Sequence, residues 1–136
     1  MLDIVIVGAG IAGLSAATSL RRAGHTVRIY EKSSLNREIG AALTVPPNAY
    51  RFLRAWGLDP VRWHWVRSRR SDRLDPFTME PVLQVSHEGT MTSVAGLPMW
   101  HAHRVDLHNA LKWMATREDG PGVPAVIYLK SAVKDY

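Results

Sequence analysis

Six residues near the start of the chain, Gly8-Ala9-Gly10-Ile11-Ala12-Gly13, have the spacing GxGxxG. In this spacing the first glycine allows a tight turn, the second lets a pyrophosphate approach the backbone, and the third lets a following helix pack against a strand. The amides of Ile11 and Ala12 would face the phosphates at the positive end of the helix dipole. The motif therefore indicates a phosphate-binding loop.

An acidic residue, Glu31, stands where such a loop needs a partner, at the end of the next expected strand. A carboxylate at this place accepts hydrogen bonds from ribose hydroxyls. It also repels a 2′-phosphate, which disfavours NADP in this slot. The alternative is a glycine motif that only packs a helix and binds no ligand, but the strand, helix and acidic residue all fit the dinucleotide fingerprint.

The elements that must position these residues follow from the apolar pattern. Residues 3–8 predict a buried, parallel strand, and residues 25–31 predict a second strand. Between them, residues 11–23 predict a helix that ends at Gly24, with apolar residues at helical spacing: Ile11, Leu14, Ala17 and Leu20. Strand, helix and strand form a βαβ unit, and its default crossover is right-handed.

Downstream, Pro46-Pro47-Asn48 predicts a helix start with Asn48 as its cap, and Gly57 predicts its end. The apolar face of this helix is expected to comprise Ala49, Phe52, Leu53 and Trp56. Residues 61–99 suggest a meander of short strands, of which 81–85 is one. A helix over 105–115, a turn at 120–122 and a strand over 123–129 complete the expected elements.

Composition and charge limit the class of protein. The chain has 136 residues, 46% of them hydrophobic and 21% charged, which is typical of a globular domain. It has no cysteine, which excludes disulfides and zinc–thiolate sites, and neither a secretory leader nor a membrane span is evident. We expect a cytoplasmic protein without a membrane partner.

The net charge of +5 is concentrated in residues 51–73, where seven arginines face only Asp59 and Asp72. A solvated arginine-rich face is the first interpretation. An anion site is the second, and a nucleic-acid surface, suggested by the interleaved Trp56, Trp63 and Trp65, is the third. We expect no nucleic-acid partner.

Catalytic and metal-binding patterns are weak. His101, His103 and His108 do not converge well at their spacing, and no paired carboxylate joins them, so we expect packing or surface histidines and no metal. Ser15 is not in a GxSxG elbow. No residue of this chain is predicted to be catalytic.

Several segments resemble known flavoproteins. The stretch from Gly8 to Glu31 resembles the N-terminus of FAD-dependent oxidoreductases of the glutathione-reductase type. Residues 38–43, 46–48, 56–58 and 103–111 resemble class A flavoprotein monooxygenases, above all their fungal, salicylate-hydroxylase-like branch. The resemblance implies a Rossmann-like α/β FAD-binding domain with a parallel sheet. It also implies FAD as cofactor, NADPH or NADH as transient reductant, and O2-dependent hydroxylation of an aromatic or other electron-rich small molecule.

The resemblance also implies roles for individual residues. Glu31 would bind the adenosine ribose, Arg104 would reach the flavin or its diphosphate, and Ala42 stands near the ribityl path where the family usually has glycine. The alternative for Arg104 is a surface salt bridge with Asp106 or Glu118, and for Arg37 a solvated loop position. The complete set of expected cofactor-binding residues is Gly8, Gly10, Ile11, Ala12, Gly13, Glu31, Lys32, Arg37, Ala42 and Arg104.

The family continues with a "DG" and a "GD" motif, and the chain contains neither of them in the expected place. We therefore expect residues 1–136 to be the N-terminal part of the FAD-binding domain, incomplete without a companion C-terminal segment. Residues 60–98 are expected to contribute strands towards the substrate-side sheet. The alternatives are a fragment of an NAD-dependent dehydrogenase and a non-catalytic nucleotide-binding module.

Overall fold

The computed structural model describes residues 1–35, 40–88 and 96–135. The chain forms two compact units. Unit 1 comprises residues 1–41 and 104–136, and unit 2 comprises residues 42–103. None of the helices in the described ranges is long and apolar enough to cross a membrane.

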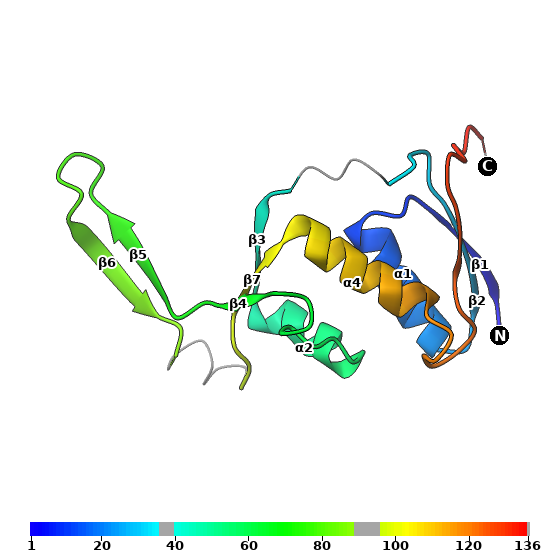
Figure 1. Ribbon diagram of the computed structural model, residues 1–136, viewed down its shortest axis with the longest axis horizontal. Coiled ribbons are helices and arrows are strands. Elements are labelled where there is room, and N and C mark those ends of the chain that lie inside the picture. The colour runs from blue at the N-terminus through cyan, green and yellow to red at the C-terminus, as the bar shows by residue number, and fades with distance from the viewer. Residues whose placement is uncertain (36–39, 89–95, 136) are drawn as a thin grey trace. The chain divides into compact units, whose positions relative to one another are not determined.

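Unit 1 is built on a parallel sheet and two helices (Figure 1). Its strands are β1 (Asp3–Val7), β2 (Thr26–Tyr30) and β8 (Val126–Tyr128), in the order β1-β2-β8. Both neighbouring pairs run parallel, with Val7 opposite Tyr30 and Tyr30 opposite Tyr128. The helices are α1 (Ile11–Arg22), which packs against β1 and β2, and α4 (Arg104–Thr116), which lies alongside α1. The predicted βαβ unit and parallel sheet are confirmed.

Helix α1 begins and ends close to the predicted residues. Gly24 follows the helix with a φ of 85°, a left-handed conformation that glycine adopts without a Cβ penalty, and its N–H donates to the Arg21 carbonyl. Leu14 and Ala17 are buried as the periodicity predicts. Arg21 is also buried, at 1% exposure, although an arginine is rarely expected on the inner face of a helix.

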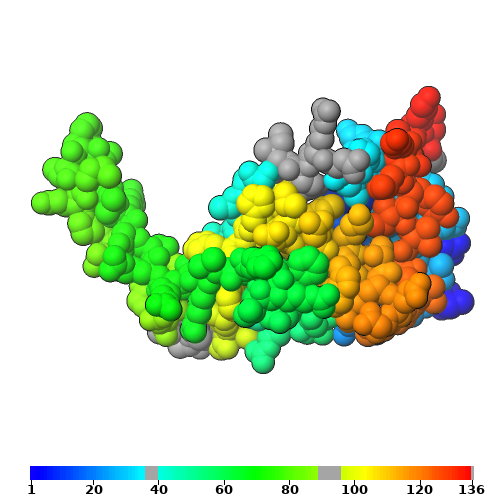
Figure 2. All heavy atoms as spheres, viewed as in Figure 1, coloured from blue at the N-terminus to red at the C-terminus, as the bar shows by residue number. Residues whose placement is uncertain are grey.

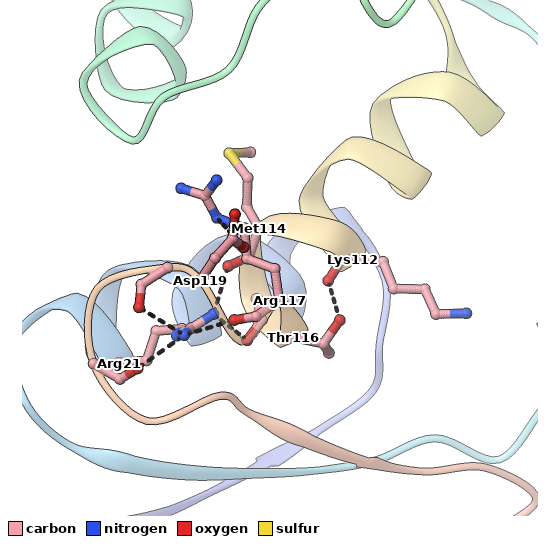
Figure 3. Close-up of polar contacts among 9 residues, drawn as sticks. Arg21, Lys112, Met114, Thr116, Arg117 and Asp119 are labelled. Carbon is pink, nitrogen blue, oxygen red and sulfur yellow. Dashed lines mark hydrogen bonds and ion pairs between the residues drawn. The ribbon is translucent and has the colours of Figure 1, made fainter.

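Arg21 joins the ends of the two helices of unit 1. Its guanidinium donates to the carbonyls of Met114 and Ala115 at 2.9 and 3.1 Å, and to those of Arg117 and Gly122 at 3.0 and 2.8 Å. Figure 3 shows the side chain directed into the turn that follows α4. The last carbonyls of α4 have no intrahelical partner, so this cation both satisfies them and matches the negative end of the helix.

The prediction that the first strand is buried is wrong. Val5 and Val7 are 51% and 64% exposed, whereas Val27 and Ile29 on β2 are fully buried. The reason is that α1 covers one face of the sheet, and no described element covers the side chains of the other face. The apolar side chains of β1 on that face are therefore exposed.

Unit 2 contains one helix and short antiparallel strands. Strands β3 (Ala42–Val45), β7 (Trp100–His103) and β4 (Val66–Arg67) form a sheet in the order β3-β7-β4, and β5 (Arg70–Leu74) pairs with β6 (Pro81–Ser86) as a hairpin. The predicted short strands, including the one at 81–85, are confirmed within the described part of 61–99. They do not form one meander, because β4 pairs with β7 whereas β5 pairs with β6.

Helix α2 (Pro47–Ala55) differs from the prediction in its cap and its face. Pro46 occupies the N-cap position and no side chain caps the helix, so Asn48 lies inside the first turn. The buried residues are Pro47, Tyr50 and Leu53, while Phe52 is 51% exposed. The buried face is set by what packs against the helix: the Tyr50 ring lies edge-on to the Trp100 ring, 5.8 Å between centroids, a contact that the apolar pattern of the helix does not contain.

The β5–β6 hairpin is exposed on both faces, and Figure 2 shows it in light green with no described side chains packed over the face turned towards the viewer. At its base, Ser68 Oγ and His87 Nδ1 lie 2.7 Å apart, and both residues are buried. All seven arginines of residues 51–73 are exposed, but Trp65 is only 5% exposed. A solvated arginine face accounts for these exposures better than a stacking surface for bases.

The chain leaves and re-enters unit 1 at adjacent points. Arg104 N–H donates to the Ala41 carbonyl at 2.9 Å, although residues 42–103 lie between them in the sequence. Immediately beyond this bond, Ala42 pairs with His103. The junction therefore continues the antiparallel pairing of β3 and β7.

Candidate functional site

The GxGxxG loop has the geometry that each glycine requires. Gly8 has a φ of 95°, which L side chains rarely adopt, and its N–H donates to the Tyr30 carbonyl at 2.8 Å. A Cβ added at Gly13 would lie 2.0 Å from the Gly8 carbonyl oxygen, so only glycine lets α1 pack this closely against the turn. The loop between β1 and α1 is therefore held against both neighbouring elements.

Gly10 is different, because a Cβ there would meet no described atom within 4 Å. Gly10 is the N-cap residue of α1, with extended φ and ψ of −72° and −178°, and no side chain caps the helix. No described atom requires glycine at this position, and open space beside the backbone is what the close approach of a pyrophosphate needs. The sequence assigned this same role to Gly10.

The first turn of α1 exposes amide donors. Gly10 C=O accepts the first helical bond from Leu14 N–H, and within the described residues no acceptor is found for the amides of Ile11 and Ala12. There is also no acidic residue in the first turn that would compete with an anion. Unpaired amides at the positive end of a helix suit a phosphate group, so the residues present fit a pyrophosphate.

Glu31 holds the loop from the next strand. Its Oε2 accepts from Ala9 N–H at 2.7 Å, and its Oε1 accepts from Ser33 N–H at 2.8 Å. The residue is 9% exposed, and hydrogen bonds from the amides of Ser33 and then Ala9 lower the pKa of this carboxyl group below its ordinary value. Each oxygen retains a second lone pair, which leaves the carboxylate able to accept from a ribose hydroxyl as well.

A cavity of about 280 Å³ lies beside Glu31. Its lining includes Gly8, Tyr30, Lys32 and residues 131–133. Residues 131–133 follow β8, and ligands of open α/β folds bind beyond the carboxyl ends of parallel strands. The strand was predicted from the sequence, but these three residues were not, although the rule for carboxyl ends points to the segment that follows the strand.

The remaining expected cofactor-binding residues lie in different places. Lys32 is exposed and lines the cavity, and Arg104 is the first residue of α4 in unit 1. Ala42 is exposed and begins β3 in unit 2. Arg37 lies outside the described residues, as does part of the 38–43 segment. Across the described ranges, no group of three or more histidine or acidic side chains could hold a metal ion.

The sequence of this chain matches one family model and several characterised proteins. Residues 6–54 match the family model of an NAD(P)-binding Rossmann-like domain. The FAD-dependent monooxygenase cfoG of Aspergillus candidus is 53% identical over 135 residues, which are 99% of this chain and 31% of that protein. Hispidin-3-hydroxylase of Neonothopanus nambi is 40% identical, over 97% of this chain and 31% of that protein.

Solved structures agree with these sequence matches. The tetrameric form of 2-methyl-3-hydroxypyridine-5-carboxylic acid oxygenase superposes with a TM-score of 0.73 at 30% identity, over 93% of this chain and 30% of that one. The crystal structure of FqzB superposes with a TM-score of 0.76 at 25% identity, over 98% of this chain and 30% of that one.

The parallel sheet, the glycine loop and the acidic residue after β2 define a Rossmann-like dinucleotide-binding fold. Within that class, nearly the whole chain is similar to the N-terminal portion of FAD-dependent monooxygenases. It spans about 31% of the length of the curated relatives named above. The resemblance to flavoprotein monooxygenases predicted from the sequence is therefore confirmed.

Proposed function

We propose that this chain is the FAD-binding portion of an NAD(P)H- and O2-dependent monooxygenase that hydroxylates an aromatic or other electron-rich small molecule. The observation that carries the proposal is the open space at Gly10, bordered by the unpaired amides of α1, with Glu31 bound to the same loop. The names of the relatives support the reaction class, since they are FAD-dependent monooxygenases and hydroxylases. When bound, the flavin supplies the redox chemistry, and the protein supplies binding and orientation.

In this proposal each part of the cofactor is bound by different residues. The amides of Ile11 and Ala12 bind the pyrophosphate, and Glu31 accepts from the adenosine ribose. The cavity beside Glu31 receives the adenine end, and Lys32 lies at its rim. Arg104, Arg37 and Ala42 are assigned to the flavin end on the strength of the family resemblance.

We assign the strands of residues 60–98 to the substrate side of the protein. They are antiparallel and belong to unit 2, separate from the parallel sheet that carries the glycine loop. Because the hairpin is exposed on both faces, it can add to a larger sheet. We further propose that a companion C-terminal segment completes the protein, and that the substrate is a small molecule.

The test is to purify the native protein, denature it and identify every polypeptide and released cofactor by mass spectrometry. Release of FAD together with a flavin absorbance band is the expected result. NAD without flavin would support a dehydrogenase instead. Absence of both, with no FAD binding on titration, would leave a non-catalytic nucleotide-binding module.

A NADPH-oxidation assay with and without phenolic compounds then tests the reaction class. We expect the rate of NADPH oxidation to rise in the presence of a hydroxylatable phenol and one hydroxyl oxygen of the product to come from labelled O2. Incorporation of oxygen from water alone would refute the monooxygenase assignment.

A further inference from the structure

His108 reaches the phosphate-binding loop from a distant part of the sequence. It lies in α4 and is 2% exposed, and its Nε2 is 2.7 Å from the Ala9 carbonyl oxygen. A carbonyl only accepts, so Nε2 must carry the proton and donate. From the sequence, His108 was predicted to be an ordinary packing or surface histidine, and no local spacing links two residues 99 positions apart.

With this contact, both backbone polar groups of Ala9 are hydrogen-bonded to side chains. The Ala9 N–H donates to Glu31 and its carbonyl accepts from His108, both at 2.7 Å, and the residue is fully buried. In a trans peptide the carbonyl and the following N–H point in opposite directions. Fixing the Ala9 carbonyl towards α4 therefore fixes the Gly10 N–H away from it.

The Gly10 N–H belongs to the residue whose surroundings are open. A Cβ at Gly10 meets no described atom within 4 Å, and the next two amides begin α1 without an acceptor in the described part of the chain. A donor at this place in the loop contributes most to anion binding when its peptide is held in one orientation before the ligand arrives. Ordering the peptide on binding would cost free energy and reduce the affinity.

We infer that His108 is a positioning residue for the cofactor's pyrophosphate, and that it acts by holding the Ala9–Gly10 peptide in its binding orientation. The inference rests on the proposed FAD site and assigns His108 no contact with the cofactor itself. The buried Ala9 carbonyl has no other donor among the described residues, so a side chain that merely filled the same volume would leave it unpaired.

The test compares three variants of the native protein. His108→Leu removes the donor, and His108→Gln keeps an N–H donor at similar reach. Leu111→Ala, one turn further along α4 at a fully buried residue, removes packing and keeps His108 in place as the donor. The dissociation constant for FAD is measured by flavin fluorescence well below each melting temperature, and the Gly10 amide is followed by nitrogen-15 NMR in the cofactor-free protein.

We expect His108→Leu to weaken FAD binding roughly tenfold and His108→Gln by less than about threefold, which corresponds to the loss or retention of one buried hydrogen bond. Leu111→Ala should melt at a lower temperature with its dissociation constant unchanged. The Gly10 amide resonance should move in His108→Leu and stay in place in Leu111→Ala.

Two results would overturn the inference. One is a His108→Leu protein that binds FAD as tightly as the wild type, and the other is a Gly10 resonance that does not respond to His108→Leu. If the wild type itself binds no FAD, the proposed function fails, and the NMR comparison still decides whether His108 orients the peptide.

Discussion

The glycines of the loop allow cofactor binding to be separated from folding. Gly10 has extended φ and ψ that any residue adopts, and a Cβ there meets no described atom within 4 Å. Gly10→Ala should therefore change the free energy of unfolding by no more than about 1 kcal/mol, because the lost helix-cap preference and the gain from a less flexible unfolded chain nearly offset each other.

The same substitution should damage FAD binding severely. A methyl group at Gly10 stands between the backbone and the pyrophosphate, and Gly10→Val fills more of that path. Losing two hydrogen bonds to a charged phosphate costs about 3 kcal/mol or more, which is at least about a 100-fold increase in the dissociation constant. Gly10→Val should bind no measurable FAD.

Gly13→Ala is the matched counterpart. Its Cβ would lie 2.0 Å from the Gly8 carbonyl oxygen and 3.3 Å from Ile6 Cγ2, so backbone must move. We expect a loss of about 3 kcal/mol in stability, at the upper end for overpacking. Urea unfolding and FAD titration on all three variants test the reasoning. A Gly10→Val protein with wild-type flavin content, or a Gly13→Ala protein of wild-type stability, would refute it.

Three further predictions concern other residues. Hydrogen bonds from amides lower the pKa of the Glu31 carboxyl below its ordinary value of 4.5, so its charge stabilises the fold above that pH, and this stabilisation is lost as the pH falls through the pKa of the folded state. The free energy of unfolding, measured from pH 7 to 3, should therefore fall more steeply for wild type than for Glu31→Gln. Arg21→Met should cost about 3–5 kcal/mol in a melting or urea experiment, since it leaves buried carbonyls unpaired, whereas Arg22→Met, at an exposed position, should cost less than about 1. Ser68→Ala should cost about 1–3 kcal/mol by the same measurement, because it leaves the buried His87 Nδ1 without this partner.

Each of these has a result that contradicts it. Parallel pH profiles for wild type and Glu31→Gln would show that the carboxylate is not ionised against the two amides. Equal losses for the substitutions at Arg21 and Arg22 would show that burial of the guanidinium is unimportant. A Ser68→Ala protein that melts with the wild type would show that the hydroxyl adds nothing to the fold.

The local sequence pattern was sufficient to predict the helices and strands that carry the candidate site. The strand–helix–strand start, a helix over 105–115 that the structure extends to 104–116, and the turn and packing roles of Gly8 and Gly13 were predicted, because each depends on residues close together in the sequence. The role of Gly10 towards a pyrophosphate remains a prediction. The role of Glu31 was predicted in part, since its bonds to Ala9 and Ser33 were not foreseen and its bond to ribose remains a prediction.

The rest depends on contacts between distant residues. Arg21 is buried because the carbonyls that it satisfies come from residues 114–122, and His108 is buried because its acceptor is Ala9. The exposure of Val5 and Val7 depends on what covers the second face of the sheet. No periodicity within a single segment contains this information.

The junction between Ala41 and Arg104 has a consequence for how the sequence of such a protein can evolve. Because these two residues share a hydrogen bond, the chain leaves unit 1 and returns to it at neighbouring positions, and residues 42–103 form an insertion whose two ends lie close together. Insertions at closely spaced ends are well tolerated. The insertion of residues 42–103 can therefore be lengthened, shortened or replaced by that of a relative while α4, and with it His108, keeps its place in unit 1. Under the proposed assignment of residues 60–98 to the substrate side, selection for new substrates can act on unit 2 while the glycine loop of unit 1 stays unchanged.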